Sequence, residues 1–170
     1  KGSGMDMPAM WQVQLSDIIV GSTRLGICGA NGCQAALDTG TSVIAGPESF
    51  IDGLLGGLAI QEDCSNYGEL PALGFHLGTH VLSIEPQDYV KKAGSPAKCF
   101  HQFLKIDVPP PKGPVVLLGD PFLRRYFTIY DRESLQVGLA FASHAQIRGR
   151  ETSSQAAARL MRFMPPSGPR

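Results

Sequence analysis

The chain has 170 residues, enough for one domain with its own core, and combines 43% apolar residues with 20 glycines and 13 prolines. This composition favours a turn-rich β protein over a helical one. The formal charge of zero divides into +4 from His144 onward and −4 over residues 1–143. The net negative charge of residues 1–143 argues against nucleic acid as a partner. No stretch is apolar enough to span a bilayer.

Short strands separated by turns are expected along most of the chain. After a lead-in over residues 1–10, which follows a cleavage site or a linker, Trp11, Val13 and Leu15 alternate with polar residues as in a strand. The expected strands are residues 11–20, 24–28, 35–37, 72–77, 79–84, 99–108, 115–118, 127–131 and 136–142.

Two short helices are predicted where proline stands at a first helical position. The first begins at Pro47 and ends at Gly56-Gly57, and the second has Asp120 as its N-cap and extends to Tyr126. A basic extension follows over residues 143–170. Its segment 155–164 has one apolar side and the composition of a short amphipathic helix, although we favour a disordered tail.

The four cysteines allow three pairings, of which we favour Cys28–Cys33 with Cys64–Cys99. Disulfides would place the chain in a secretory or vesicular compartment. A zinc site using Cys99, His101 and a distant cysteine pair is a weaker alternative, because the ligand spacing is poor.

Residues 35–44 surround one acidic side chain with hydroxyl groups. An apolar run leads into Asp38, Gly40 permits a close bend, and Thr39, Thr41 and Ser42 carry hydroxyls. Asp38 can accept the Gly40 N–H on one oxygen and the Thr41 hydroxyl on the other. A bare Asp-Thr-Gly triplet more often marks only a turn at the end of a strand, so the wider sequence must decide.

Several further motifs occur with this one in a fixed order, and the ordered set resembles the C-terminal lobe of pepsin-like aspartic proteases. The matching stretches are residues 11–13, the loop and strand over 28–42, then 45–47, 106–111, 117–120, 127–131 and 137–140. The resemblance implies an all-β, pepsin-like lobe with short helices over residues 11–142. The extension over 143–170 lies outside it.

The resemblance also implies a chemistry. Peptide hydrolysis in this family uses a water held between two carboxylates that share a proton, a pair that serves as a standard example of coupled acids. Asp38 would be one of the two, and Leu117-Leu118-Gly119 would pack beneath its turn. Thr39, Gly40, Thr41 and Ser42 would support the carboxylate, with Thr39 reaching the other lobe. Asp120 is expected to be a helix cap rather than the second acid, and no metal or cofactor is implied.

Only one Asp-Thr/Ser-Gly motif occurs in this chain, and the tyrosine-bearing flap of the family is missing. We therefore favour the C-terminal chain of an aspartic endopeptidase that acts on protein or peptide substrates at acidic pH. Its N-terminal lobe would be a separate chain or fragment, and its location a secretory or acidic vesicular compartment or the exterior. The alternatives are a non-catalytic docking or structural subunit of a larger assembly, and a homodimer that uses Asp38 twice.

Overall fold

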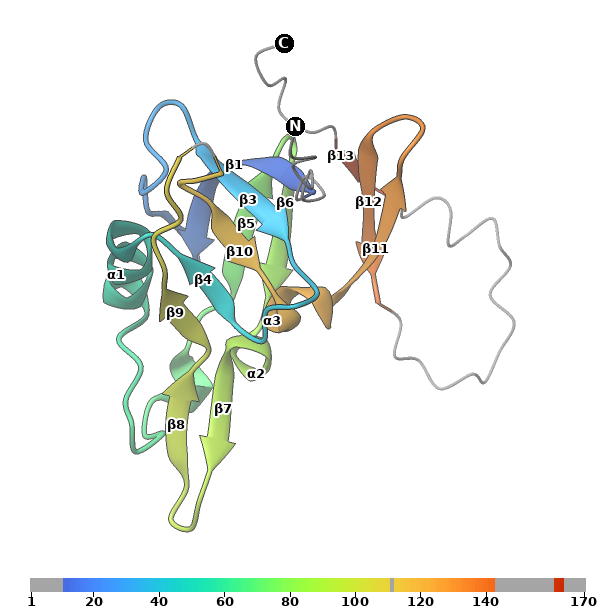
Figure 1. The fold of residues 1–170 in the computed structure, drawn as a ribbon. Coiled ribbons are helices and arrows are strands. Elements are labelled where there is room, and N and C mark those ends of the chain that lie inside the picture. Colours follow the sequence, from blue (N-terminus) through green and yellow to red (C-terminus); the bar gives the residue numbers. More distant parts are fainter. Residues whose placement is uncertain (1–10, 111, 143–160, 164–170) are drawn as a thin grey trace, which may run out of the picture.

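A computed structural model describes residues 11–110, 112–142 and 161–163, and most of its elements are strands (Figure 1). The strands are β1 (Gln12–Val20), β2 (Thr23–Arg24), β3 (Cys33–Leu37), β4 (Ile44–Gly46), β5 (Leu73–Leu77), β6 (His80–Ile84), β7 (Val90–Ala93), β8 (Lys98–His101), β9 (Phe103–Lys105), β10 (Val116–Leu118), β11 (Tyr126–Asp131), β12 (Gln136–Phe141) and β13 (Met161–Phe163). The helices are α1 (Glu48–Leu58), α2 (Pro86–Tyr89) and α3 (Asp120–Leu123), with a 3₁₀ turn at Tyr67–Glu69. The expected all-β class with short helices is confirmed.

The main sheet has eight strands in the order β6-β5-β1-β3-β10-β4-β9, with β2 paired to β1. Most neighbours are antiparallel, but β10 runs parallel to β3 and β9 runs parallel to β4. Because β10 lies between β3 and β4, the loop over residues 38–43 that joins β3 to β4 must cross the end of β10. This crossing places the Asp38 loop at the ends of the central strands β3 and β10.

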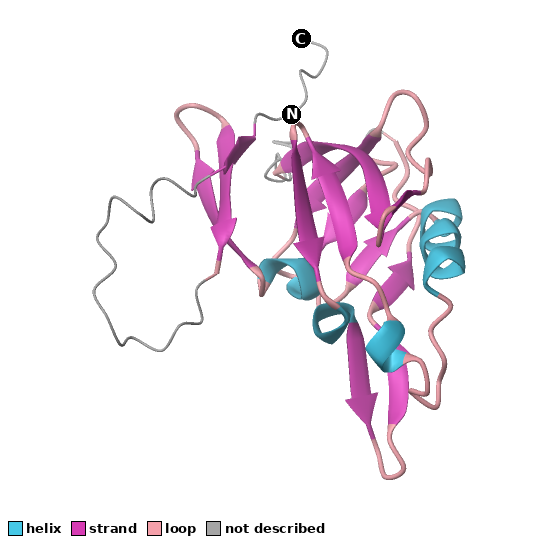
Figure 2. Ribbon diagram, turned by 180° about the vertical axis from the view of Figure 1, so that it is seen from behind, coloured by secondary structure: helices cyan, strands magenta, loops and turns pink. Residues whose placement is uncertain are grey.

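Two smaller units extend from the main sheet. The β7–β8 hairpin projects from it, and β11, β12 and β13 form a separate three-stranded sheet at its side (Figure 2). Val137 and Leu139 of β12 are fully buried against the main core. The inner face of the small sheet therefore belongs to the same core as the main sheet.

Aromatic side chains connect the small sheet to the main one. The ring of Phe122 in α3 lies 5.3 Å from that of Phe75 in β5 and 4.8 Å from that of Tyr126 in β11. The Tyr126 hydroxyl donates to the Ser83 carbonyl at 2.8 Å. Burial raises the pKa of Tyr126 to about 12, as expected for a phenol held neutral in a core.

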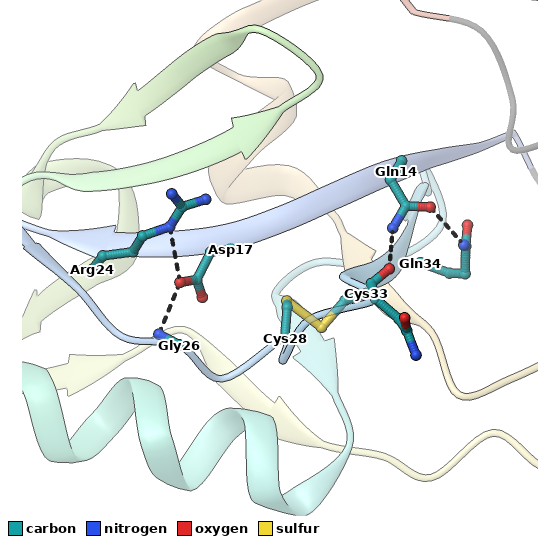
Figure 3. The surroundings of a disulfide bond; sticks show 8 residues. Gln14, Asp17, Arg24, Gly26, Cys28, Cys33 and Gln34 are labelled. Carbon is teal, nitrogen blue, oxygen red and sulfur yellow. Dashed lines mark hydrogen bonds and ion pairs between the residues drawn. A yellow bond between two sulfur atoms is a disulfide. The ribbon is translucent and has the colours of Figure 1, made fainter.

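Both favoured disulfides, Cys28–Cys33 and Cys64–Cys99, are present. The shorter one closes the loop that leads into β3 (Figure 3). Beside it, the Gln14 side chain on β1 donates to the Asn31 carbonyl at 2.9 Å and accepts from the Gln34 amide at 3.0 Å. Since Cys99 is bonded to Cys64, it is not available to the alternative zinc site.

Helix α1 continues through the two glycines that were expected to end it, and stops at Leu58 with Ala59 in the left-handed conformation at φ 46°. Two glycines of α1, Gly53 and Gly57, serve close packing instead of termination. A Cβ at Gly53 would come within 2.7 Å of a methyl carbon of Ile27. The proline expected at the first helical position is the N-cap, Pro47.

Other boundaries also differ from those expected. The strand expected over 24–28 is only the two-residue β2, and Asp120 is the first residue of α3, with Gly119 as its N-cap. The three described residues of the segment 155–164 form β13, because they pair with β12. At these residues the favoured disordered tail and the alternative helix are both wrong. The remainder of that segment and the lead-in over 1–10 lie outside the described residues.

Candidate active site

Asp38 follows β3 directly and is fixed by backbone hydrogen bonds of the sheet. Its N–H donates to the Leu118 carbonyl at the end of β10, at 3.2 Å, and the preceding Leu37 N–H donates to the Trp11 carbonyl at 3.1 Å. The backbone at Asp38 is thus held by a neighbouring strand, while its half-buried side chain remains accessible from outside.

Two donors from the same loop hold the Asp38 carboxylate. The Gly40 N–H donates to Oδ1 at 2.9 Å, and the Thr41 hydroxyl donates to Oδ2 at 2.6 Å. These are the two hydrogen bonds expected from the sequence. Because each oxygen has its own donor, the orientation of this carboxyl group is well defined.

The underside of the loop rests on the start of α3. The Asp120 N–H donates to the Thr41 carbonyl at 2.9 Å. A Cβ at Gly119 would collide with the carbonyl oxygens of Thr41 and Val43, so a residue without a side chain is required there. Gly119 packs beneath the turn as expected, and Leu117 and Leu118 lie in β10, within the strand expected over 115–118.

The remaining predicted site residues lie around this centre. Thr39 and Ser42 are exposed on the outer surface of the loop, where they can meet another molecule. Asp120 forms an ion pair with Arg124, with 3.1 Å between its Oδ2 and the Arg124 Nη1. The Asp120 side chain thus has a structural partner at the C-cap of its own helix.

Gln102 is a residue of the site surroundings that the sequence did not single out. Its backbone carbonyl accepts from the Ile44 N–H at 2.9 Å, where the loop re-enters the sheet as β4. Its side chain is 4% exposed and donates to the Asp88 carbonyl at 2.9 Å. No local signal distinguishes this glutamine from a surface one, because its burial depends on β4 and α2.

In the part of the chain that the structure describes, no group of three or more histidine, cysteine, aspartate or glutamate residues is placed to hold a metal ion. Within the same residues, no helix has both the length and the apolar character needed to cross a membrane.

Comparison with known proteins places these features in a family. A family model described as eukaryotic aspartyl protease matches residues 3–142. Plasmepsin VI of Plasmodium berghei (strain Anka) is 34% identical over 143 residues, which cover 79% of this chain and 32% of that protein. Cathepsin D of Homo sapiens is 37% identical over 145 residues, covering 79% of this chain and 35% of the relative.

Renin of Echis ocellatus is 36% identical over 137 residues, which cover 76% of this chain and 34% of that protein. The chain thus spans about a third of the length of the curated relatives it matches. The family match includes the sheet, the small β11–β12 hairpin and the loop that orients Asp38. The chain belongs to the eukaryotic aspartyl protease family, and its lobe is pepsin-like.

Proposed function

We propose that this chain is the C-terminal lobe of an aspartic endopeptidase and supplies one of its two catalytic aspartates, Asp38. The observation that carries the proposal is the accessible carboxylate whose two oxygens are held separately by Gly40 and Thr41. This arrangement fixes the direction of the carboxylate, as holding and activating a water would require, and the family match covers the loop that carries it.

The proposed reaction needs a second carboxylate on the far side of that water. Two carboxyl groups about 3 Å apart share one proton. The pair can then take a proton from the attacking water and give a proton to the leaving nitrogen. The pair titrates as a unit, and no separate role belongs to Asp38. Since this state requires one proton on the pair, activity is expected at acidic pH.

The partner is expected to be an N-terminal lobe with the other Asp-Thr/Ser-Gly and the flap, and the substrate a protein or peptide bound between the lobes. Exposed Thr39 supports contact with the partner's matching turn. Phe127, Ile129 and Phe141 of the β11–β12 hairpin are 60%, 42% and 56% exposed. By the strand register, Phe127 and Ile129 lie on the outer face of the hairpin, and Phe141 lies on the other face beside Tyr126. Exposed apolar side chains on the outer face support a surface that another folded unit covers.

We further infer a secretory or acidic vesicular location, or export from the cell. The two disulfides support it, because such bonds persist in oxidising compartments and are rare where thiols are kept reduced.

The decisive experiment combines this chain with a fragment carrying the other lobe and follows cleavage of a peptide at acidic pH. The mixture should be active and the chain alone inactive. Asp38→Asn should lower turnover by at least about 10³-fold, since the proton transfers of the pair are lost. Asp120→Asn is the matched control, because it changes an aspartate outside the proposed catalytic pair and should retain activity.

Three results would contradict the proposal. Substantial turnover by Asp38→Asn would show that this carboxylate is not part of the mechanism. Activity of the chain alone, together with a dimeric mass in sedimentation, would favour the homodimer. A complex that binds the other lobe but cleaves nothing over the whole acidic range would favour a docking subunit.

A further inference from the structure

The basic extension contributes a strand to the folded lobe. Met161–Phe163 form β13, which pairs antiparallel with β12 through Leu139↔Met161, Gly138↔Arg162 and Val137↔Phe163. The family match ends at residue 142, just after β12. The matched part alone therefore pairs β12 with β11 on one side and leaves its other edge open, which is the usual place for an added strand.

One aromatic side chain fixes β13 to the core. Phe163 is 7% exposed, and its register partner Val137 is fully buried. The Phe163 ring lies edge-to-face on His80 at 5.8 Å, and its Cδ1 approaches the space beside Gly78. Phe163 thus fills a pocket between β12 and the turn joining β5 to β6.

The neighbouring side chain points to the opposite face. Arg162 lies opposite Gly138, and a shallow hollow there is lined by Ile129, Asp131, Gln136, Gly138 and Arg162. The positive charge of Arg162 contributes to lowering the pKa of Asp131, after the hydrogen bonds from Ser134 and Glu133. The alternation of an aromatic residue inward and a cation outward defines one register for the added strand.

We propose that the free edge of β12 and the Phe163 pocket together form a binding site for an extended peptide, which this chain occupies with its own residues 161–163. The ligand class is a short strand that adds antiparallel to β12, with an aromatic side chain for the pocket and a cation for the outer face. Backbone hydrogen bonds supply the binding and the pocket supplies the specificity. Because only three residues pair, another strand of the same pattern can replace β13.

The test uses the full chain and needs no proteolytic activity. Phe163→Asp places a charge in the apolar pocket and should release β13, which should speed amide hydrogen exchange in β12 at least about tenfold. Phe100→Asp is the matched control, since it makes the same change at a phenylalanine that is 52% exposed on β8, outside the proposed site; exchange in β12 should stay within about twofold of the unaltered chain.

Binding of a labelled synthetic peptide with the sequence of residues 158–166 then measures whether the vacated site accepts a strand. It should bind the Phe163→Asp chain and not the unaltered chain, whose site is filled, and the same peptide carrying the Phe163→Asp change should bind neither. If the Phe163→Asp chain fails to fold, Phe163→Ala replaces it with the same measurements. Unchanged exchange in β12, or a folded variant that does not bind the peptide, would overturn the proposal.

Discussion

Thr41 links the acidic side chain to the scaffold beneath it. Its hydroxyl donates to Asp38 Oδ2 at 2.6 Å, while its carbonyl accepts the Asp120 N–H at 2.9 Å. The same residue therefore fixes the direction of the carboxylate and holds the loop against the start of α3. Only the first of these roles depends on the side chain.

We expect Thr41→Ala to lower kcat/KM of the reconstituted protease about 10- to 100-fold. A hydrogen bond to a charged group contributes about 1.5–3 kcal/mol, and each 1.4 kcal/mol in a barrier is about tenfold in rate. Thr41→Ser keeps the hydroxyl and should retain most of the activity. Equal rates for the alanine and serine variants would show that this hydrogen bond does not matter to catalysis.

The environment of Asp38 was predictable from sequence because it is local. Both donors lie within three residues of the acid, so the turn itself brings them together. Asp17 shows the opposite case. It is 3% exposed, and its Oδ2 accepts from Arg24 Nε at 3.2 Å and from the Gly26 N–H at 2.8 Å (Figure 3). Its burial follows from the pairing of β1 with β5, which no local sequence pattern predicts.

At the scale of elements, the start of α3 packs so closely against the Asp38 loop that its N-cap, Gly119, leaves no room for a side chain. Gly119→Ala should lower the melting temperature by several degrees, because the new methyl group would collide with two loop carbonyls. It should also reduce activity by displacing the loop. Gly56→Ala is the matched control: a Cβ there meets open space, and alanine favours the helix by up to about 1 kcal/mol. Thermal unfolding measures the melting temperatures of both variants. Equal melting temperatures would contradict this account.

The turn between β11 and β12 depends on Asp131. Its Oδ2 accepts the Ser134 hydroxyl at 2.6 Å, and its Oδ1 accepts the N–H groups of Ser134 and Glu133. The Ser134 side chain is the largest cause of the lowered pKa of Asp131. A lowered pKa in the folded state means that this stabilisation is present above the unfolded pKa, near 4, and is lost as the pH falls through the folded pKa.

Ser134→Ala should therefore raise the pKa of Asp131 toward its ordinary value, as followed by NMR titration of the carboxyl carbon. The hairpin should then open at a higher pH than in the unaltered chain. Ser65→Ala is a matched control on another exposed Asx turn, where Asp63 should respond and Asp131 should not. An unchanged Asp131 titration in Ser134→Ala would show that the hydroxyl is not the cause.

Element boundaries were harder to predict than element types, and the reasons are tertiary. The two glycines after Leu55 resemble a helix end, yet α1 continues because Gly57 packs closely on Leu25 and Val20. Strand β13 was missed because helix-forming residues precede it in sequence, whereas its conformation depends on the open edge of β12. In both cases packing from a distant segment overrides local preference.

At the scale of the whole molecule, the two disulfides constrain different lengths of chain. Cys28–Cys33 spans five positions and acts within the loop before β3. Cys64–Cys99 spans 35 positions, so β5, β6, α2 and β7 all lie within the loop that it closes. The longer bridge thus restrains the unfolded chain more strongly, and it ties the β7–β8 hairpin, near its turn, to the segment after α1.

Loop closure predicts that removing Cys64–Cys99 with paired alanines costs about 4 kcal/mol, against about 2 kcal/mol for Cys28–Cys33. Denaturant unfolding of the two double variants, each compared with the oxidised chain, measures this order. Reducing the unaltered chain should destabilise it by at least as much as the larger of the two, which provides an internal control. If the Cys28–Cys33 variant were the less stable, native packing around β3, where Gln14 and Gln34 flank that bridge, would outweigh the restraint on the unfolded chain.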